Sequence, residues 1–270
     1  MDAEIAKLKG IACDCRIDML KALATAESGH TAAPMGIMDF LVAMYFKILN
    51  IDPKNPQKSD RDRFVLSCGH YAPALYAVMA HRGFFPIKEL LTLRDLNSRL
   101  QGHPHNLALP GIENTSGPLG QGISQAVGMA LAAKIDQKKH HIYCLTSDGE
   151  TQEGQVWEAL MLAPARELDN LTCFVDRNFI QIDGNTEDVV PLEPLAKKYQ
   201  AFGWHTIEID GHNFNQIIDG CLQAKSTHLP TMIILNTIPG KAVKEIENDF
   251  TWHGKPPTPE EAERFIKELK

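Results

Sequence analysis

The sequence predicts an α/β protein in which a doubly wound parallel sheet carries helices on both faces. Short apolar segments with strand character alternate with helical patterns through the middle of the chain. Polar residues also follow directly after two of these segments, where parallel sheets bind their ligands. A chain of 270 residues can bury roughly three quarters of its unfolded surface without metal or disulfide staples. We expect one domain over residues 1–270, with irregular functional loops and a tail from about residue 237.

The elements can be placed in order along the chain. The first fifty residues are expected to be helical around a polar, glycine-rich loop from Ser28 to Pro34. Five short apolar segments bounded by turn formers predict strands at 64–66, 142–146, 172–176, 206–209 and 232–235. Apolar periodicity predicts helices at 72–82, 122–136, 156–167 and 214–224, the last capped by Asn213, and mixed acidic and basic residues predict a helix at 259–269. The long segment 100–119 is rich in Pro and Gly, which is typical of a functional loop.

Composition and charge exclude several classes of protein. With 44% hydrophobic and 23% charged residues, the chain is neither disordered nor fibrous. A net charge of −7 without any basic block argues against nucleic acid as a partner. The first ten residues lack the apolar centre of a signal peptide, and the longest apolar run, 40–46, is too short to cross a membrane, so we expect a cytoplasmic protein. The six cysteines are expected to be reduced thiols.

Histidines beside glycines are the first chemical signal. Four of the 11 histidines directly follow a glycine, where composition alone predicts about 0.8 such pairs. Glycine lets the backbone bend and leaves the imidazole open to a ligand, and imidazole moves protons near neutral pH. We interpret His212 as a structural residue of a strand-to-helix turn. The histidines expected to converge on a site are His30, His70, His103 and His253, although their spacing does not suit a zinc site.

Oxygen ligands for a divalent cation are the second signal. Asp148 follows one predicted strand directly, and Asn178 follows the next strand thirty residues later. Mg2+ prefers oxygen ligands and usually shares them with the phosphates of a substrate or cofactor. Asp148, Asn178 and one backbone carbonyl would leave coordination positions for diphosphate oxygens. Because an Asp-Gly pair is also common in ordinary turns, a plain turn remains the alternative.

These residues belong to a longer pattern that resembles the amino-terminal half of transketolase, the thiamine diphosphate enzyme of sugar-phosphate exchange. The resemblance runs from Gly29-His30 to His253-Gly254. It rests on the segments SCGHYAPALYA (67–77), QGHP (101–104), SGPLGQGISQAVGMALA (116–132), SDGETQEGQVWEA (147–159), DRNFIQIDG (176–184) and TWHG (251–254). The resemblance implies the thiamine diphosphate-binding fold.

The resemblance also implies roles for individual residues. It implies that Mg2+ or Ca2+ is bound by Asp148, Asn178 and the carbonyl of Ile180. The cofactor would be bound by His70, Gly117, Leu119, Asp148, Gly149, Asn178, Ile182 and His253. Proton transfer and substrate binding would fall to His30, His103 and His253. Glu153 and Glu158 resemble carboxylates at the family's dimer interface, although acids at a helix start also have a structural explanation.

A complete transketolase is more than twice this length. The pyrimidine-binding domain, with the glutamate that activates the cofactor, and the third domain have no counterpart here. The resemblance therefore implies the N-terminal subunit of a two-chain transferase. We expect a partner C-terminal subunit of about 300 residues in an α2β2 heterotetramer. Together they would pass a two-carbon ketol unit from a ketose (phosphate) to an aldose (phosphate).

Some positions depart from the family, and other functions remain open. Thr31-Ala32-Ala33 stands where Pro-Gly-Ala is usual, Ser147 stands where Gly is usual, and Pro239 and Ala242 are also unusual. The sugar could therefore be apulose phosphate or a sulfo-sugar rather than a pentose phosphate. The α subunit of a 2-oxo acid dehydrogenase, a nucleotide-dependent oxidoreductase based on Gly120-Gln-Gly122, and a non-catalytic regulator are the remaining alternatives.

Overall fold

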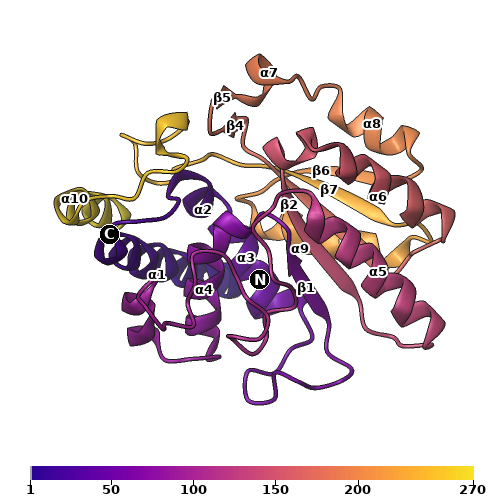
Figure 1. The fold of residues 1–270 in the computed structure, drawn as a ribbon, viewed down its shortest axis with the longest axis horizontal. Coiled ribbons are helices and arrows are strands. Elements are labelled where there is room, and N and C mark those ends of the chain that lie inside the picture. Colours follow the sequence, from indigo (N-terminus) through magenta and orange to yellow (C-terminus); the bar gives the residue numbers. More distant parts are fainter. Residues whose placement is uncertain (1) are drawn as a thin grey trace.

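The sheet is the centre of the molecule, which we describe over residues 2–270 of a computed structural model (Figure 1). Its five strands are all parallel and lie in the order β1-β2-β3-β7-β6. They are β1 (Arg63–Leu66), β2 (Ile142–Ser147), β3 (Leu171–Arg177), β6 (His205–Asp210) and β7 (Thr231–Asn236). Each predicted strand is present and is one to two residues longer than expected. The predicted doubly wound parallel sheet is confirmed.

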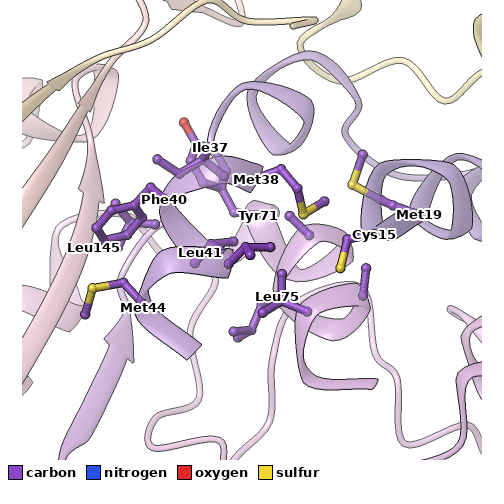
Figure 2. Close-up of a cluster of buried hydrophobic side chains, with 14 of the residues drawn as sticks. Cys15, Met19, Ile37, Met38, Phe40, Leu41, Met44, Tyr71, Leu75 and Leu145 are labelled. Carbon is purple, nitrogen blue, oxygen red and sulfur yellow. The ribbon is translucent and has the colours of Figure 1, made fainter. Parts of the chain in front are cut away.

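Helices cover both faces of this sheet (Figure 1). One face carries α3 (Met38–Ala43), α4 (Ala72–Arg82) and α9 (Phe214–Ser226), with α1 (Asp2–Ala26) packed outside α4 and α10 (Pro259–Leu269) packed against α1. The other face carries α5 (Gln121–Ile135), α6 (Gly154–Ala165) and α8 (Leu195–Ala201). The helical cluster on the first face is shown in Figure 2, where Phe40 and Leu41 of α3, and Met44 directly after it, lie between the sheet and the helices.

Local signals explain where several helices begin. The Asn213 side chain accepts hydrogen bonds from the backbone N–H groups of Asn215 and Gln216 at the start of α9, as predicted. Thr258 and Glu261 form a reciprocal capping box at the start of α10. The predicted bounds of α4 and α10 agree with the structure at both ends.

The segment after α1 differs from the polar loop that we expected. Residues 31–34 are buried, and α2 (Ala32–Gly36) begins inside the predicted loop. The reason is tertiary packing: the backbone N–H of Gly240 donates to the carbonyl of Ala32 at 2.7 Å. A Cβ atom at Gly36 would lie 2.7 Å from the carbonyl oxygen of Ile238. The small residues of α2 therefore allow the chain after β7 to pack directly on it.

Short elements complete the chain. They are η1 (Met44–Ile48), η2 (Gly69–Tyr71), η3 (Ile87–Thr92), η4 (Gly149–Gln152), β4 (Ile180–Gln181), β5 (Gly184–Asn185), α7 (Thr186–Val189) and η5 (Phe250–Trp252). Residues 100–119 contain no helix or strand, as predicted. All six cysteines are free thiols, and only Cys13 is not buried. Within residues 2–270, none of the helices combines the length and apolar character that crossing a membrane requires.

Candidate active site

A cavity of about 350 Å³ opens at the carboxyl ends of β1, β2 and β3. Segments that are distant in sequence form its wall: the loop after α1, the turn after β1, the 100–119 loop, the β4–β5 hairpin and the tail. The predicted site residues on this wall are His30, His70, His103, Gly117, Leu119, Gly149, Ile180, Ile182 and His253. The structure thus brings together nine of the eleven residues singled out in the sequence.

Three of the four histidines form a triangle. The ring centroids of His30 and His70 lie 5.0 Å apart, those of His30 and His253 5.5 Å, and those of His70 and His253 5.3 Å. Burial and the neighbouring imidazole of His253 lower the pKa of His30 to about 4. Burial likewise lowers the pKa of His70 and of His253. These imidazoles are therefore neutral near pH 7.

Several polar atoms on this side of the cavity lack a hydrogen-bond partner. Within the described part of the chain, nothing pairs with His30 Nδ1, His70 Nε2, His253 Nδ1 or Ser116 Oγ, although all four atoms are buried. An unpaired buried polar atom costs about 1–3 kcal/mol. A cluster of them beside a cavity is suited to a polar ligand that supplies the missing partners.

A glycine contact brings the 100–119 loop to the histidines. A Cβ atom at Gly69 would lie 2.7 Å from Ser116 Oγ and 2.9 Å from the Gly117 nitrogen, so no other residue fits there without movement. Gly117 itself has a φ of +157° and lies against the ring of His103. His103 stands exposed at the mouth of the cavity, and partial burial lowers its pKa.

Asp148 lies beneath the cavity wall rather than on it, because its side chain is fully buried behind Gly149. Its Oδ2 atom accepts hydrogen bonds from Arg177 Nη1 at 3.0 Å and from the Phe179 N–H at 2.8 Å. Its Oδ1 atom accepts one from the Gly149 N–H at 2.7 Å. Burial, reinforced by the charge of Asp176, raises the pKa of Asp148 to about 7. The positive charge around Asp148 is therefore not enough to keep its carboxylate fully ionised near pH 7.

Asn178 is also buried, and its side-chain amide is held in one orientation. Its Nδ2 atom donates to Asp176 Oδ2 at 2.7 Å and to Tyr71 Oη at 3.0 Å. Asp176 further accepts hydrogen bonds from Tyr71 Oη at 2.6 Å and Thr237 Oγ1 at 2.5 Å. The Asn178 Oδ1 atom accepts from the Ile180 N–H at 3.0 Å. Sequence reasoning missed this support because Tyr71 and Thr237 come from other parts of the chain.

These oxygen atoms suit a hard divalent cation. Asp148 Oδ1, Asn178 Oδ1 and the Ile180 carbonyl are the donor types that Mg2+ and Ca2+ prefer. Across residues 2–270 there is no group of three His, Cys, Asp or Glu side chains able to hold a metal alone. A cation here would therefore need amide, carbonyl and ligand oxygens in addition to one carboxylate. The buried, charge-deficient carboxylate fits such an ion.

Three further acids lie in different environments. Glu150 is fully buried and bonded to the Ser67 hydroxyl, to the Gly120 N–H at 2.7 Å and to the Ser147 N–H at 3.2 Å, and burial raises its pKa to about 7. It thus joins the ends of β1 and β2 to the start of α5. Glu153 lines the cavity at the start of α6, whereas Glu158 is exposed on the outer surface of that helix.

His212 has the structural position that we inferred from its turn. Its Nδ1 atom lies 2.9 Å from Asp39 Oδ2, and its Nε2 atom accepts a hydrogen bond from the Ile238 N–H at 2.8 Å. Asp39 also binds Arg16 through both carboxylate oxygens. His212 therefore connects α3 with the chain after β7, outside the cavity.

A cavity at the carboxyl ends of parallel strands, beside a buried acid and several unpaired polar atoms, is typical of a ligand-binding α/β protein. Residues 9–269 match the family described as "Transketolase, thiamine diphosphate binding domain". The chain belongs to this transketolase family, as the motifs predicted.

Relatives and solved structures agree with this assignment. The chain is 46% identical to the 6-deoxy-6-sulfo-D-fructose transketolase subunit SqwG of Clostridium sp. (strain MSTE9), covering 90% of this chain and 88% of that one. It is 39% identical to one subunit of the apulose-4-phosphate transketolase of Phocaeicola vulgatus, covering 90% and 87%. It is 40% identical to mouse transketolase, covering 97% and 42%. The crystal structure of Campylobacter jejuni transketolase superposes with a TM-score of 0.91 at 35% identity, covering 100% and 43%.

These comparisons separate two kinds of relative. The chain spans less than half of the mouse and Campylobacter transketolases but nearly nine tenths of the two proteins named as subunits. The prediction of a transketolase N-terminal subunit is confirmed. A 2-oxo acid dehydrogenase subunit, our alternative within thiamine enzymes, is not favoured by these relatives.

Proposed function

We propose that this chain is the cofactor-diphosphate half of a two-chain transketolase and acts only with a C-terminal partner subunit. The observation that carries the proposal is the cavity that gathers four histidines, Gly117, Leu119, Gly149, Ile180 and Ile182 above Asp148 and Asn178. We infer further that residues 1–270 form one domain, that the protein is cytoplasmic, and that two copies of each chain make an α2β2 assembly.

Thiamine diphosphate, when bound, supplies a carbanion and an electron sink. The protein supplies orientation, charge and proton transfer. Asp148, Asn178 and the Ile180 carbonyl would hold Mg2+ (or Ca2+), and the Gly149 N–H and His70 would bind the diphosphate. The Gly117 carbonyl would accept a hydrogen bond from the aminopyrimidine. Leu119 and Ile182 would contact the apolar faces of the ring system.

The histidines would carry out the proton transfers. The neutral imidazoles of His30 and His253 line the cavity, and each carries one donor and one acceptor nitrogen, so each could donate to or accept from a sugar hydroxyl. His103, at the cavity mouth beside Gly117, is placed to contact the sugar as it enters. Because nearby imidazoles would repel one another if charged, the triangle favours one proton at a time.

For the substrate, we propose a ketose that carries a terminal anionic group, phosphate or sulfonate, as donor, with an aldose acceptor. The support is the similarity to subunits named for 6-deoxy-6-sulfo-D-fructose and apulose-4-phosphate. Thr31, which replaces the usual proline beside His30, lies next to the histidine triangle and is a candidate determinant of this preference.

The test is to purify the chain alone and with its candidate partner, and to assay ketol transfer from sulfofructose, apulose phosphate and xylulose phosphate with thiamine diphosphate and Mg2+. We expect activity only when both chains are present. Full activity of the chain alone would contradict the two-chain proposal. Failure of the assembled complex to bind thiamine diphosphate would contradict the assigned cofactor site.

A further inference from the structure

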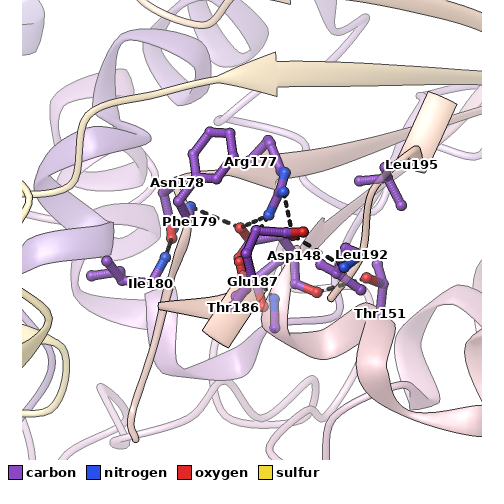
Figure 3. A network of polar contacts seen from close by, with 12 residues as sticks. Asp148, Thr151, Arg177, Asn178, Phe179, Ile180, Thr186, Glu187, Leu192 and Leu195 are labelled. Atoms are coloured by element: carbon purple, nitrogen blue, oxygen red, sulfur yellow. Dashed lines mark hydrogen bonds and ion pairs between the residues drawn. The ribbon is translucent and has the colours of Figure 1, made fainter. Parts of the chain in front are cut away.

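We propose that Arg177 is a positioning residue that couples the metal-binding carboxylate to the segment 186–193, so that cofactor binding and ordering of this segment stabilise each other. The inference rests on the proposed function, because it takes Asp148 as the metal ligand. Figure 3 shows the guanidinium group of Arg177 close to Asp148 and to Thr186 and Glu187 of this segment. None of the sequence motifs assigned a role to this residue.

The contacts of Arg177 use every nitrogen of its guanidinium group. The side chain is only 1% exposed. Nη1 donates to Asp148 Oδ2 at 3.0 Å and to Thr186 Oγ1 at 2.8 Å. Nη2 donates to Glu187 at 2.6 Å and to Glu193 at 2.9 Å, and Nε donates to Glu193 at 3.3 Å. The guanidinium group also lies 3.8 Å over the ring of Phe179.

The orientation of the Asp148 carboxylate follows from these contacts. Arg177 and the Phe179 N–H both bind Oδ2, so the carboxylate cannot rotate without breaking two hydrogen bonds. Oδ1 is left with only the N–H of the adjacent Gly149. Arg177 thereby binds Oδ2 and leaves Oδ1 oriented toward a cation. Residues that orient a metal ligand in this way contribute substantially to metal affinity.

The second half of the coupling is the segment 186–193. Glu187 accepts Arg177 Nη2 and also the N–H groups of Leu192 at 3.1 Å and Glu193 at 3.3 Å, so it closes the segment into a loop around the guanidinium group. The N–H of Thr186 donates to the carbonyl of Phe179 at 3.0 Å. The β4–β5 hairpin between Phe179 and Thr186 carries Ile180 and Ile182 to the cavity wall. Arg177 therefore fixes both ends of the hairpin that would contact the cofactor.

Charge explains why the two halves depend on each other. One guanidinium group faces three carboxylates, those of Asp148, Glu187 and Glu193. A divalent cation at Asp148 would relieve the excess negative charge around Arg177. By thermodynamic linkage, if an ordered segment strengthens cofactor binding, then cofactor binding must order the segment by the same factor. A lysine cannot replace this planar, five-donor group because its ammonium lacks the fork geometry.

The experiment compares Arg177→Lys and Glu187→Gln with wild type in the assembled two-chain enzyme. Calorimetry measures Mg2+ affinity at saturating thiamine diphosphate, and hydrogen exchange follows residues 179–193 with and without both ligands. The matched control is Glu89→Gln, which removes a carboxylate from a surface arginine pair, Arg99–Glu89, and has no contact with the cavity. Thermal melting by circular dichroism checks that each variant is folded.

We expect Arg177→Lys to weaken Mg2+ binding about tenfold or more, the size of effect seen for residues that orient a metal ligand. Glu187→Gln touches neither the metal nor the cofactor, yet it should weaken binding severalfold and reduce the ligand-induced protection of residues 186–193. Glu89→Gln should match wild type. A loss of stability alone would lower the melting temperature without changing the Mg2+ affinity of the folded enzyme.

Wild-type affinity and protection in both Glu187→Gln and Arg177→Lys would overturn the coupling and leave the proposed function standing. A wild-type enzyme that binds neither Mg2+ nor thiamine diphosphate would overturn the proposed function and the coupling together. Weakened binding in Glu187→Gln with unchanged exchange of residues 186–193 would also contradict the coupling, because linkage requires both effects.

Discussion

The two sides of the cavity differ in whether their buried polar groups have partners within the protein. On the Arg177 side, the guanidinium group and the Asp148 carboxylate are paired within the protein. On the histidine side, His30, His70 and His253 each keep a buried nitrogen without a partner among the described residues. On the first side the charged groups are already paired with one another, and Asp148 Oδ1 alone is presented to a cation, whereas on the second side each buried nitrogen lacks a partner. In the proposed function, the metal ligands are held on the first side, and the histidines that would transfer protons lie on the second.

The largest expected effect comes from removing the negative charge of Asp148, on the Arg177 side of the cavity. Asp148→Asn keeps the volume of the side chain but removes the anionic ligand. We expect Mg2+-dependent binding of thiamine diphosphate to fall by more than about 100-fold, since the loss of a direct ligand exceeds the 10–100-fold cost of losing an orienting partner. Calorimetry on the two-chain enzyme measures it. Unchanged affinity would contradict the proposed coordination.

The second prediction compares stability on the two sides. Arg177→Met leaves the Asp148 carboxylate buried without its cation, so the free energy of unfolding should fall by about 3–5 kcal/mol. His70→Leu removes a nitrogen that has no partner, so it should cost less than about 1 kcal/mol or increase stability. Urea denaturation of both variants tests the contrast. Equal losses would mean that the two sides do not differ as described.

The third prediction concerns pH on the histidine side. The pKa of His30 is about 4 in the folded protein, below the ordinary value of 6.5. Between these values the unfolded chain binds a proton that the folded chain does not, so stability should fall as pH drops from about 6.5 to about 4. His30→Gln should make this fall shallower. Urea denaturation at several pH values within that range would show parallel slopes if His30 did not contribute.

The smallest expected effect concerns the hydrogen bond by which Thr31 joins two segments on the histidine side. The buried Thr31 hydroxyl donates to the carbonyl of Lys255 at 2.6 Å and so joins the His30 loop to the segment that carries His253. Thr31→Val should lower the free energy of unfolding by about 1 kcal/mol and change KM for the sugar more than cofactor affinity. Thr31→Ser keeps the hydroxyl and should restore both. A KM identical in Val and Ser variants would refute this role.

Local patterns account for the parts of the molecule that sequence could predict. The starts of α4 and α10 follow from Pro73 in the first turn and from the Thr258 capping box, and α4 ends at Gly83, which has a left-handed conformation. The five strands follow from apolar runs between turn formers. The β4–β5 hairpin, α7 and α8 were not predicted, because strands of two residues and helices of four to seven residues carry too little periodicity.

The candidate site divides in the same way. The sequence motifs identified the nine residues that line the cavity. They also identified Asp148 and Asn178, but not the residues that hold these two side chains in place. Arg177 resembles an ordinary charged residue after a strand, and its partners stand 29 residues before it and up to 16 residues after it. The partner of Thr31 stands 224 residues away. Such contacts exist only once the strands are ordered in the sheet, so no local signal could reveal them.

The distribution of thiols has a practical consequence. Five of the six cysteines are buried, and Cys13 alone is within reach of solvent, where its Sγ lies 3.2 Å from the Leu269 carbonyl at the end of α10. A maleimide dye added to the native protein should therefore attach at one position, on the outer helix α1. Every additional dye molecule per chain would then register an opening of the interior, so mass spectrometry could follow unfolding of each layer without any engineered label.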